Sequence, residues 1–373
     1  MTAAARIDPR PVEDDPSAWD AWVSGTSLGS YLQLSAWAEV KALNGWSSVR
    51  VATPAESAAA DAGGNARIGT QVLVRRPTPM PWAFAYAPRG PVAERWSADR
   101  VAALTERLRD RLPAVAGRVS HLRIDPEVER DGPLDGDGEL RSALRSNGWR
   151  PAPPIQPGST RVIDLVAGED ALWGDLRKKW RQYVNKARSN GIRVVDADES
   201  RLGEFYRIYR ETADRAGFLI RTEETYRATY RAFAPLGAVR LLFAETTDGE
   251  AVATLFLLRC GPRVVEPYGG MTEAGADTRA NYLLKWEAIR SSGEQGATTY
   301  DLWGLAHEGI AHFKAGFGGR EVHYVGAWDL VLDPAGRLAY DAAQRARVWV
   351  ARRRRGLATE GSAAAFDGSG GAA

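Results

Sequence analysis

The segment FKAGFGG, residues 313–319, combines residue types that could perform chemistry. Its three glycines let the backbone approach another group closely, and Lys314 lies beside an aromatic residue within it. Such a segment could place a fixed positive charge beside a bound group. The alternative is a tight turn that carries a solvated lysine, and composition alone does not decide between the two.

Two other glycine-bearing segments have a similar character. YAPRGPV contains Tyr86 and Arg89, and YGGMT begins with Tyr268. Each follows an apolar run rich in β-forming residues, so each is expected at the end of a strand. Each alone is compatible with a tight turn. Together with FKAGFGG, they are consistent with strand ends that open on one shared cleft.

Covalent and metal catalysis are poorly supported by the sequence. It contains neither a GxSxG nucleophile turn nor a GxxxxGK[ST] phosphate loop. The single cysteine, Cys260, lies in the apolar run LFLLRC, as expected of an inert buried thiol. His307 and His312 are five residues apart, which does not match one helical turn. We therefore expect no metal and no cofactor, and chemistry that depends on positioning and positive charge.

Length and charge set the broad class of the protein. The chain has 373 residues, which suits two domains, and its 49 Lys+Arg nearly balance 47 Asp+Glu. This balance excludes a generally polycationic nucleic-acid-binding protein. No apolar run approaches the roughly 20 residues that span a bilayer. The N-terminal segment MTAAARIDPRPVEDDP has no apolar signal core, so a cytoplasmic location is expected.

One local segment is nevertheless strongly basic. No acidic residue occurs from residue 176 to residue 195. The apolar residues recur at three- and four-residue intervals and predict the buried stripe of one helix, namely Leu172, Leu176, Trp180, Val184 and Ala187. The basic residues of this segment that could bind an RNA phosphate backbone are Arg177, Lys178, Arg181, Lys186 and Arg188. The alternative is a solvated helix face.

An internal repeat organises the chain. Residues 64–92 and 249–275 each begin with a glycine-bearing turn and continue as two short β-rich runs. In each copy a helix-period stretch follows, and then a short strand, HLRIDP in the first copy and YDLWG in the second. Two strand–strand–helix–strand units predict a duplicated α/β fold.

Several further elements can be assigned from local patterns. SAWAEVKALNGW predicts a helix with Ser35 as its N-cap. The proline-rich segment 150–160 predicts a linker. Residues 171–191 predict one continuous helix closed by Gly191, and a further helix is expected to end at Gly217.

Several segments, taken in chain order, resemble the FemABX peptidyltransferases, which are tRNA-dependent aminoacyltransferases of the peptidoglycan interpeptide bridge. They are WAEVKALNGW, YAPRGPV, LRIDPEV, LRKKWRQYVNKARSNGI, TADRAGFLIR, YGGMT, YDLWG and FKAGFGG. The resemblance covers about residues 33–334 and is most specific at FKAGFGG with the preceding DLWG. The acetyl-CoA loop typical of GNAT acyltransferases is not visible, which speaks against ordinary acetylation.

The resemblance implies two GNAT-like acyltransferase units without a long helical arm. Residues 1–150 would form the first unit, completed by about residues 326–350. Residues 158–325 would form the second unit, and residues 356–373 a disordered tail.

The resemblance also implies roles for individual residues. Lys314 matches the family's charge-stabilising lysine, with Phe313 and Gly316 in the same motif. Asp301 is either a transient base or a structural residue at a strand end. The positions that match substrate-binding residues or lie beside them are Trp37, Lys41, Tyr86, Arg89, Arg221, Tyr226 and Tyr268.

The expected reaction transfers an amino acid from aminoacyl-tRNA to the amine of the third stem-peptide residue of a cell-wall precursor. The acceptor would be UDP-MurNAc-pentapeptide or a lipid-linked precursor. Two alternatives remain open, a tRNA-dependent amide-forming ligase of specialised metabolism and a non-catalytic relative that binds RNA or precursor. The basic run 352–355 allows peripheral membrane contact, or is inert.

Overall fold

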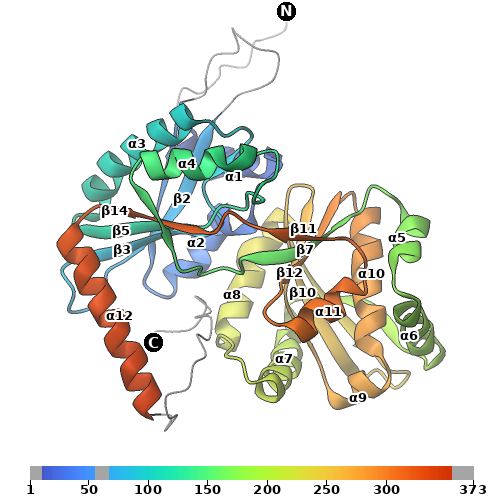
Figure 1. The fold of residues 1–373 in the computed structure, drawn as a ribbon. Helices are drawn as coiled ribbons and strands as arrows, with labels where there is room; N and C mark the ends of the chain where they lie inside the picture. The colour runs from blue at the N-terminus through green and yellow to red at the C-terminus, as the bar shows by residue number, and fades with distance from the viewer. Residues whose placement is uncertain (1–10, 55–66, 355–373) are drawn as a thin grey trace, which may run out of the picture.

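The structure of the chain is a computed structural model in which residues 11–54 and 67–354 are described. It contains two mixed β-sheets, each covered by helices, that lie side by side (Figure 1). The tail predicted at residues 356–373 lies outside the described residues, as do residues 1–10. Within the described ranges, no helix combines the length and apolar character needed to cross a membrane.

The first sheet has the strand order β1-β2-β3-β5-β14-β6, with β4 paired to β2. Its strands are β1 (Ser47–Ala52), β2 (Ile68–Arg75), β3 (Ala83–Ala87), β4 (Val92–Ala93), β5 (Val119–Ile124), β6 (Trp149–Ala152) and β14 (Ala327–Val331). Only the β3–β5 pair is parallel. The helix α3 (Ala98–Ala116) makes this parallel connection.

The second sheet has the strand order β13-β7-β12-β11-β10-β9-β8. Its strands are β7 (Ser159–Asp164), β8 (Arg193–Ala197), β9 (Val239–Glu245), β10 (Ala251–Cys260), β11 (Arg263–Met271), β12 (Thr299–Gly304) and β13 (Arg320–His323). Its one parallel pair is β11–β12, connected by α10 (Ala280–Glu294). Both sheets therefore contain the strand–strand–helix–strand unit that the sequence repeat predicts.

One strand of the first sheet, β14, comes after the whole second sheet in the chain. After β6, the last strand of the first unit, the chain crosses over, and β7 pairs with β12 and β13 of the second sheet. After β13 it crosses back, and β14 pairs with β5 and β6 of the first sheet. The two crossings meet where Tyr324 N donates to Gly158 O at 3.0 Å. The first sheet is thus completed by a strand that follows the second sheet, whereas the second sheet is formed by one continuous part of the chain.

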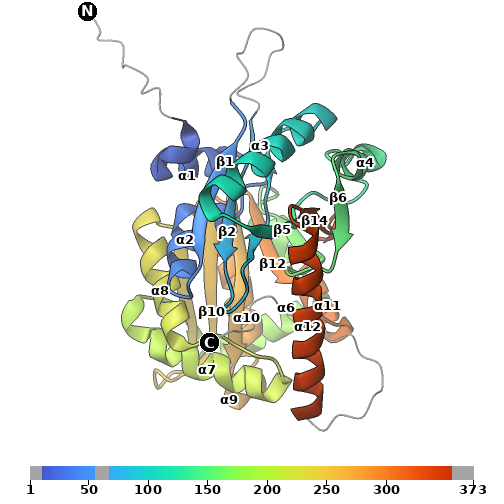
Figure 2. The same cartoon turned by 90° about the vertical axis from the view of Figure 1, so that its left-hand side faces the viewer.

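The remaining helices cover the faces of the sheets (Figures 1 and 2). They are α1 (Pro16–Gly25), α2 (Ser35–Ala42), α4 (Glu139–Ser146), α5 (Glu169–Asp175), α6 (Lys178–Ser189), α7 (Leu202–Ala216), α8 (Glu223–Phe233), α9 (Glu273–Asp277), α11 (Glu308–Ala315) and α12 (Pro334–Arg354). The prediction that Ser35 caps α2 is wrong. Leu34 is the N-cap residue, and the Ser35 hydroxyl group donates to Asp20 instead.

The helix predicted across residues 171–191 is broken. Leu176 and Arg177 have extended backbone angles, so the chain forms α5 and α6 rather than one helix. The predicted apolar stripe is nevertheless buried at every position. Helical periodicity predicted the burial correctly, because the residues on both sides of the break pack into the same apolar core.

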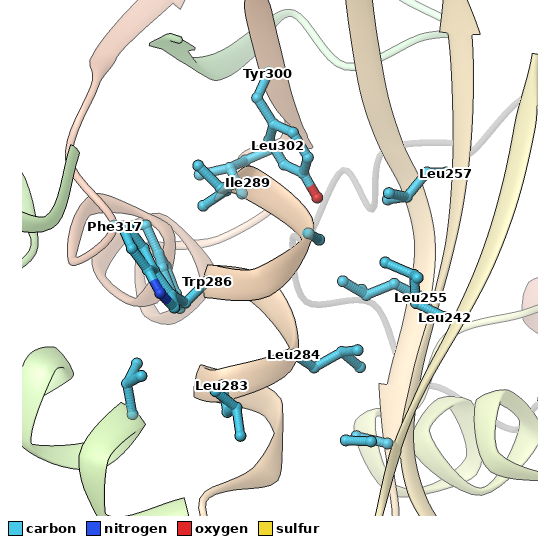
Figure 3. Packing of buried hydrophobic residues seen from close by; sticks show 14 of the residues in the cluster. Leu242, Leu255, Leu257, Leu283, Leu284, Trp286, Ile289, Tyr300, Leu302 and Phe317 are labelled. Carbon is cyan, nitrogen blue, oxygen red and sulfur yellow. The ribbon is translucent and has the colours of Figure 1, made fainter. Parts of the chain in front are cut away.

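Three apolar cores hold these layers together. One lies between the second sheet and α10 and contains Trp286, Leu255 and Tyr300 (Figure 3). A second core lies between the first sheet and α3. The third joins the halves, because Trp19 and Trp37 from the N-terminal helices pack with residues of α7, α8 and β10. The N-terminal helices therefore fix the first half against the second.

Candidate active site

Lys314 lies in the last turn of α11 and points at the end of β12. Its ammonium nitrogen donates to the carbonyl oxygen of Gly304 at 2.7 Å and to that of Trp303 at 3.1 Å. The side chain is half-buried. An ammonium group has three N–H donors, so these two bonds leave one donor for a substrate oxygen.

The charge of Lys314 is tuned by its surroundings. Burial, and then the nearby Lys285 ammonium, lower the pKa of Lys314 to about 8 against the opposing effect of Glu266 and Asp301. The side chain stays mostly protonated near neutral pH. A positive charge that is already in place before reaction costs little reorganisation when negative charge develops beside it.

Lys285 belongs to a buried polar group that the sequence analysis missed. It extends from α10 and forms an ion pair with Glu266 of β11. Tyr300 of β12 donates its hydroxyl to the other oxygen of Glu266 at 2.8 Å. β11 and β12 pair only over Arg263–Val265 and Thr299–Asp301, so Glu266 stands where the two strands part. A lysine within the apolar run NYLLKW was the available sequence clue.

Asp301 is fully engaged in internal contacts. One carboxylate oxygen accepts from the Thr160 hydroxyl and from the backbone N–H of Trp303, and the other pairs with Arg263. The side chain is completely buried. This arrangement fits the structural alternative for Asp301 better than the transient base.

A buried ion network links Asp301 to the first half of the molecule. Arg263 also donates to Glu127 at 2.5 Å, and Glu127 contacts the Arg89 guanidinium at 3.1 Å. Arg263 further donates to the Tyr324 hydroxyl at 3.2 Å. Paired charges of this kind are costly to break, so the network ties both sheets to the site.

Trp303 carries the connection to Lys314. Its backbone has a φ of +63°, which is uncommon for a residue with a side chain. The Arg89 guanidinium lies 5.1 Å from its ring centroid, and the Tyr31 ring centroid lies 6.0 Å away. The carbonyl that holds Lys314 is therefore positioned from both halves.

Five of the expected substrate-binding residues form two groups, one of which packs on Tyr31. On α2, the Lys41 ammonium lies 5.1 Å from the Trp37 ring, and Trp37 packs edge-to-face on Tyr31. Two contacts join the members of the other group, which are Arg221, Tyr226 and Tyr268. Arg221 N donates to the Tyr226 hydroxyl at 3.2 Å, and the two tyrosine rings lie 5.1 Å apart. Burial, and then the charge of Tyr268, raise the pKa of Tyr31.

Tyr86 and Arg89 share one carboxylate. The Tyr86 hydroxyl donates to one oxygen of Asp125 at 2.7 Å, and the Arg89 backbone N–H donates to the other at 2.6 Å. Arg89 also donates to Pro157 O at the first chain crossing. Both residues therefore have structural partners within the fold, and Arg89 faces the Trp303 side of the site.

Phe313 and Gly316 pack against α6. The Trp180 indole N–H donates to the carbonyl oxygen of Phe313 at 3.1 Å, and the Phe313 ring lies among Trp180, Tyr282 and Phe317. A side chain at Gly316 would place its Cβ 2.2 Å from Cε2 of Trp180. These contacts fix the helix that carries Lys314.

The basic residues of α6, and Arg177 just before it, divide by their contacts. Arg181 donates to the last carbonyls of α5, and Arg188 pairs with Glu287. Arg177 contacts the imidazole of His312 on α11 at 3.0 Å. Lys178 and Lys186 are exposed and form no ion pair within the described ranges. The exposed basic end of α6 thus lies beside the helix of Lys314.

Side chains suited to metal binding are not grouped in the part of the chain that the structure describes. Cys260 is buried, and burial raises its pKa to about 12, which keeps the thiol protonated and inert.

Comparisons with known proteins agree with this arrangement. A model of the acetyltransferase (GNAT) domain matches residues 174–315. The lipid II:glycine glycyltransferase of Staphylococcus aureus strain MRSA252 is 26% identical over 238 residues, 63% of this chain and 54% of that protein. The crystal structure of FemX superposes with a TM-score of 0.74 at 21% identity, covering 86% of this chain and 96% of FemX. The chain is a homologue of the lipid II:glycine glycyltransferases.

The homology confirms the FemABX resemblance and the predicted α/β fold of the GNAT type. The chain spans about half the length of the curated glycyltransferases that it matches. The GNAT match contains Glu266, Lys285 and Lys314, whereas Lys41 and Arg89 lie outside it. The two groups of candidate residues thus come from different parts of the fold.

Proposed function

We propose that the protein is an aminoacyltransferase that moves an amino acid from aminoacyl-tRNA to the amine of the third stem-peptide residue of a peptidoglycan precursor. The observation that carries the proposal is Lys314, an ammonium group held by two carbonyls with one donor remaining, in a homologue of glycyltransferases. The two sheets would act as two GNAT-like units with the site between them.

The proposed reaction needs no further activation, because the donor ester is already reactive. The acceptor nitrogen attacks the ester carbonyl, a C–N bond forms, and the bond to the ribose oxygen breaks. The amine loses one proton and the ribose oxygen gains one. Lys314 would stabilise the oxyanion that forms between these steps and so lower the barrier by about 3 kcal/mol.

The donor tRNA would approach over α6. Lys178 and Lys186 are exposed there, and Arg177 contacts His312 on the helix that carries Lys314. Cations at this spacing suit a phosphate backbone, which they position without reading its sequence. The 3′ end of the tRNA would then reach Lys314 along α11. A tRNA donor places the reaction in the cytoplasm.

The precursor would bind from the side of Tyr31. Lys41 on α2 and Arg221 before α8 supply positive charge for its diphosphate, and Tyr268 supplies a hydroxyl group. The buried contacts of Trp37 and Tyr226 hold these groups in place. The relatives are named for lipid II, so a lipid-linked precursor is the acceptor that we favour over UDP-MurNAc-pentapeptide.

The test mixes purified protein with a charged tRNA and either precursor and follows added mass on the stem peptide by mass spectrometry. We expect a mass increase of one amino acid residue that disappears when the tRNA is digested with RNase first. RNA-dependent labelling of a different amine would instead indicate a ligase of specialised metabolism. Precursor or RNA binding without transfer would indicate a non-catalytic relative.

A further inference from the structure

Helix α12 is anchored to the first sheet by its first turns. The Tyr340 ring lies 5.1 Å from that of Phe84 and 4.7 Å from that of His121. Arg337 pairs with Asp329 of β14 and with Asp341. Beyond these contacts the helix extends past the sheet on the flank of the molecule (Figures 1 and 2).

The opposite face of α12 carries exposed apolar side chains. Leu338 is 69% exposed and Trp349 is 55% exposed. Ala342 and Arg345 are also exposed and lie between them at intervals of four, three and four residues. This spacing places all four residues on one helical stripe. Leu338 and Trp349 are thus more than half exposed on one face of a helix whose first turns are anchored to the first sheet.

The end of the same helix is strongly cationic. Residues 345–354, RARVWVARRR, contain five arginines and no acidic residue. Continuing the spacing of the stripe by three residues leads to Arg352. A helix that combines an exposed tryptophan and leucine with arginines is typical of helices that lie in a membrane interface. Tryptophan prefers the headgroup level, and arginine side chains reach the lipid phosphates.

We infer that α12 docks the protein onto an anionic lipid bilayer, with Leu338 and Trp349 inserted at the interface and the arginines on the lipid phosphates. RNA is the other anionic partner to consider. A phosphate backbone would neutralise the arginines but leave the exposed leucine and tryptophan in water. The basic helix α6 lies on the opposite flank of the molecule from α12 (Figure 1). The inference goes beyond the proposed transfer reaction and does not depend on it.

Membrane docking can be measured by vesicle flotation of the full chain, without any substrate. The probes are vesicles of phosphatidylcholine with phosphatidylglycerol and vesicles of phosphatidylcholine alone. We expect binding to the anionic vesicles, and at least about tenfold weaker binding of the double variant Leu338→Glu/Trp349→Glu. Val115→Glu is the matched control, because Val115 on α3 is also 55% exposed. Unchanged binding of the double variant, or equal loss in the control, would overturn the inference.

A second measurement does not depend on charge-introducing substitutions. Because Cys260 is buried, a polarity-sensitive dye can be attached selectively to Trp349→Cys or to Val115→Cys. Anionic vesicles should shift the emission of the dye at position 349 to shorter wavelength and leave that at position 115 unchanged. If tRNA and not vesicles shifted the emission of the dye at position 349, α12 would bind RNA and the membrane inference would be refuted.

Discussion

The ammonium nitrogen of Lys314 lies 2.7 Å from the carbonyl oxygen of Gly304, which ties the last turn of α11 to the end of β12. The neighbouring carbonyl of Trp303 accepts a second bond, and the Trp303 ring contacts Arg89 of the first half. The position of the cation therefore depends on both sheets. A lysine held in this way is suited to stabilise charge at a fixed point in space.

Replacing Lys314 should slow transfer strongly without unfolding the protein. Lys314→Met removes the oxyanion contact and should lower kcat by about 10²–10³-fold. It also removes a half-buried ammonium whose charged form is disfavoured by burial, so thermal stability should stay equal or rise. Single-turnover transfer and thermal unfolding are measured together. Arg109→Met, an exposed change on α3, is the control, and full activity of Lys314→Met would refute the assigned role.

The pH dependence of transfer should report the protonation of Lys314. Its pKa is about 8, lowered chiefly by burial, so the cationic form is lost as the pH rises through this value. If the cation stabilises the oxyanion, the rate should fall above about pH 8; a lysine base would make it rise. A guanidinium stays protonated over this pH range. The pH dependence of the residual transfer by Lys314→Arg therefore reports the deprotonation of the acceptor amine alone. A wild-type profile identical to that of the arginine variant would exclude Lys314 as the titrating group.

Lys285 should set the pH range in which Lys314 works. Its ammonium lowers the pKa of Lys314 more than Glu266 raises it. Lys285→Met should therefore move the alkaline limb of the rate profile to higher pH. The single variant also leaves Glu266 buried without its cation, at a cost of about 3–5 kcal/mol in unfolding free energy. The double variant Lys285→Met/Glu266→Gln should recover part of that stability and keep the alkaline limb of the rate profile at higher pH. If neither variant shifts the alkaline limb, Lys285 has a purely structural role.

The sequence predicted more of the fold than of the candidate site. Helical and strand periodicity identified both repeats and the buried stripe from Leu172 to Ala187, since these depend on local spacing. The break at Leu176 was not predicted, because Arg177 N donates to Gly316 O, more than a hundred residues away. Backbone contacts over such distances leave no local pattern.

The candidate site shows the same limit. Lys314 was identifiable from its glycine-rich segment, but the two carbonyls that hold it belong to β12. Lys285 looked like one charged residue in a helix, and only the sheet brings Glu266 and Tyr300 to it. A sequence shows which residues can carry charge, whereas their partners depend on strand pairing.

The exposed lysines of α6 should contribute to tRNA affinity without selecting its sequence. Lys178→Met/Lys186→Met should weaken binding of different tRNAs alike and reduce the salt slope of log K by about 1–2. Arg181→Met is the comparison, because Arg181 donates to the carbonyls of α5 and should affect stability more than the salt slope. Filter binding over a range of salt concentrations gives both quantities. An unchanged salt slope in the lysine variant would mean that the donor tRNA binds at another surface.

Gly316 should be intolerant of even one methyl group, because the Cβ of Gly316→Ala would lie 2.2 Å from the Trp180 ring. That ring is buried and donates to Phe313 O, so it cannot move without breaking this bond. We expect a loss of about 1–3 kcal/mol in unfolding free energy, measured by denaturant titration, together with lower transfer. Gly174→Ala on α5 is the matched control, since nothing lies within 4 Å of its added Cβ, and it should be neutral or stabilising by about 0.4–1 kcal/mol. Combining Gly316→Ala with Trp180→Phe should cost less than the sum of the two changes, because the smaller ring makes room for the methyl group. Strict additivity would mean that Gly316 and Trp180 do not meet, and that α11 is held against α6 in some other way.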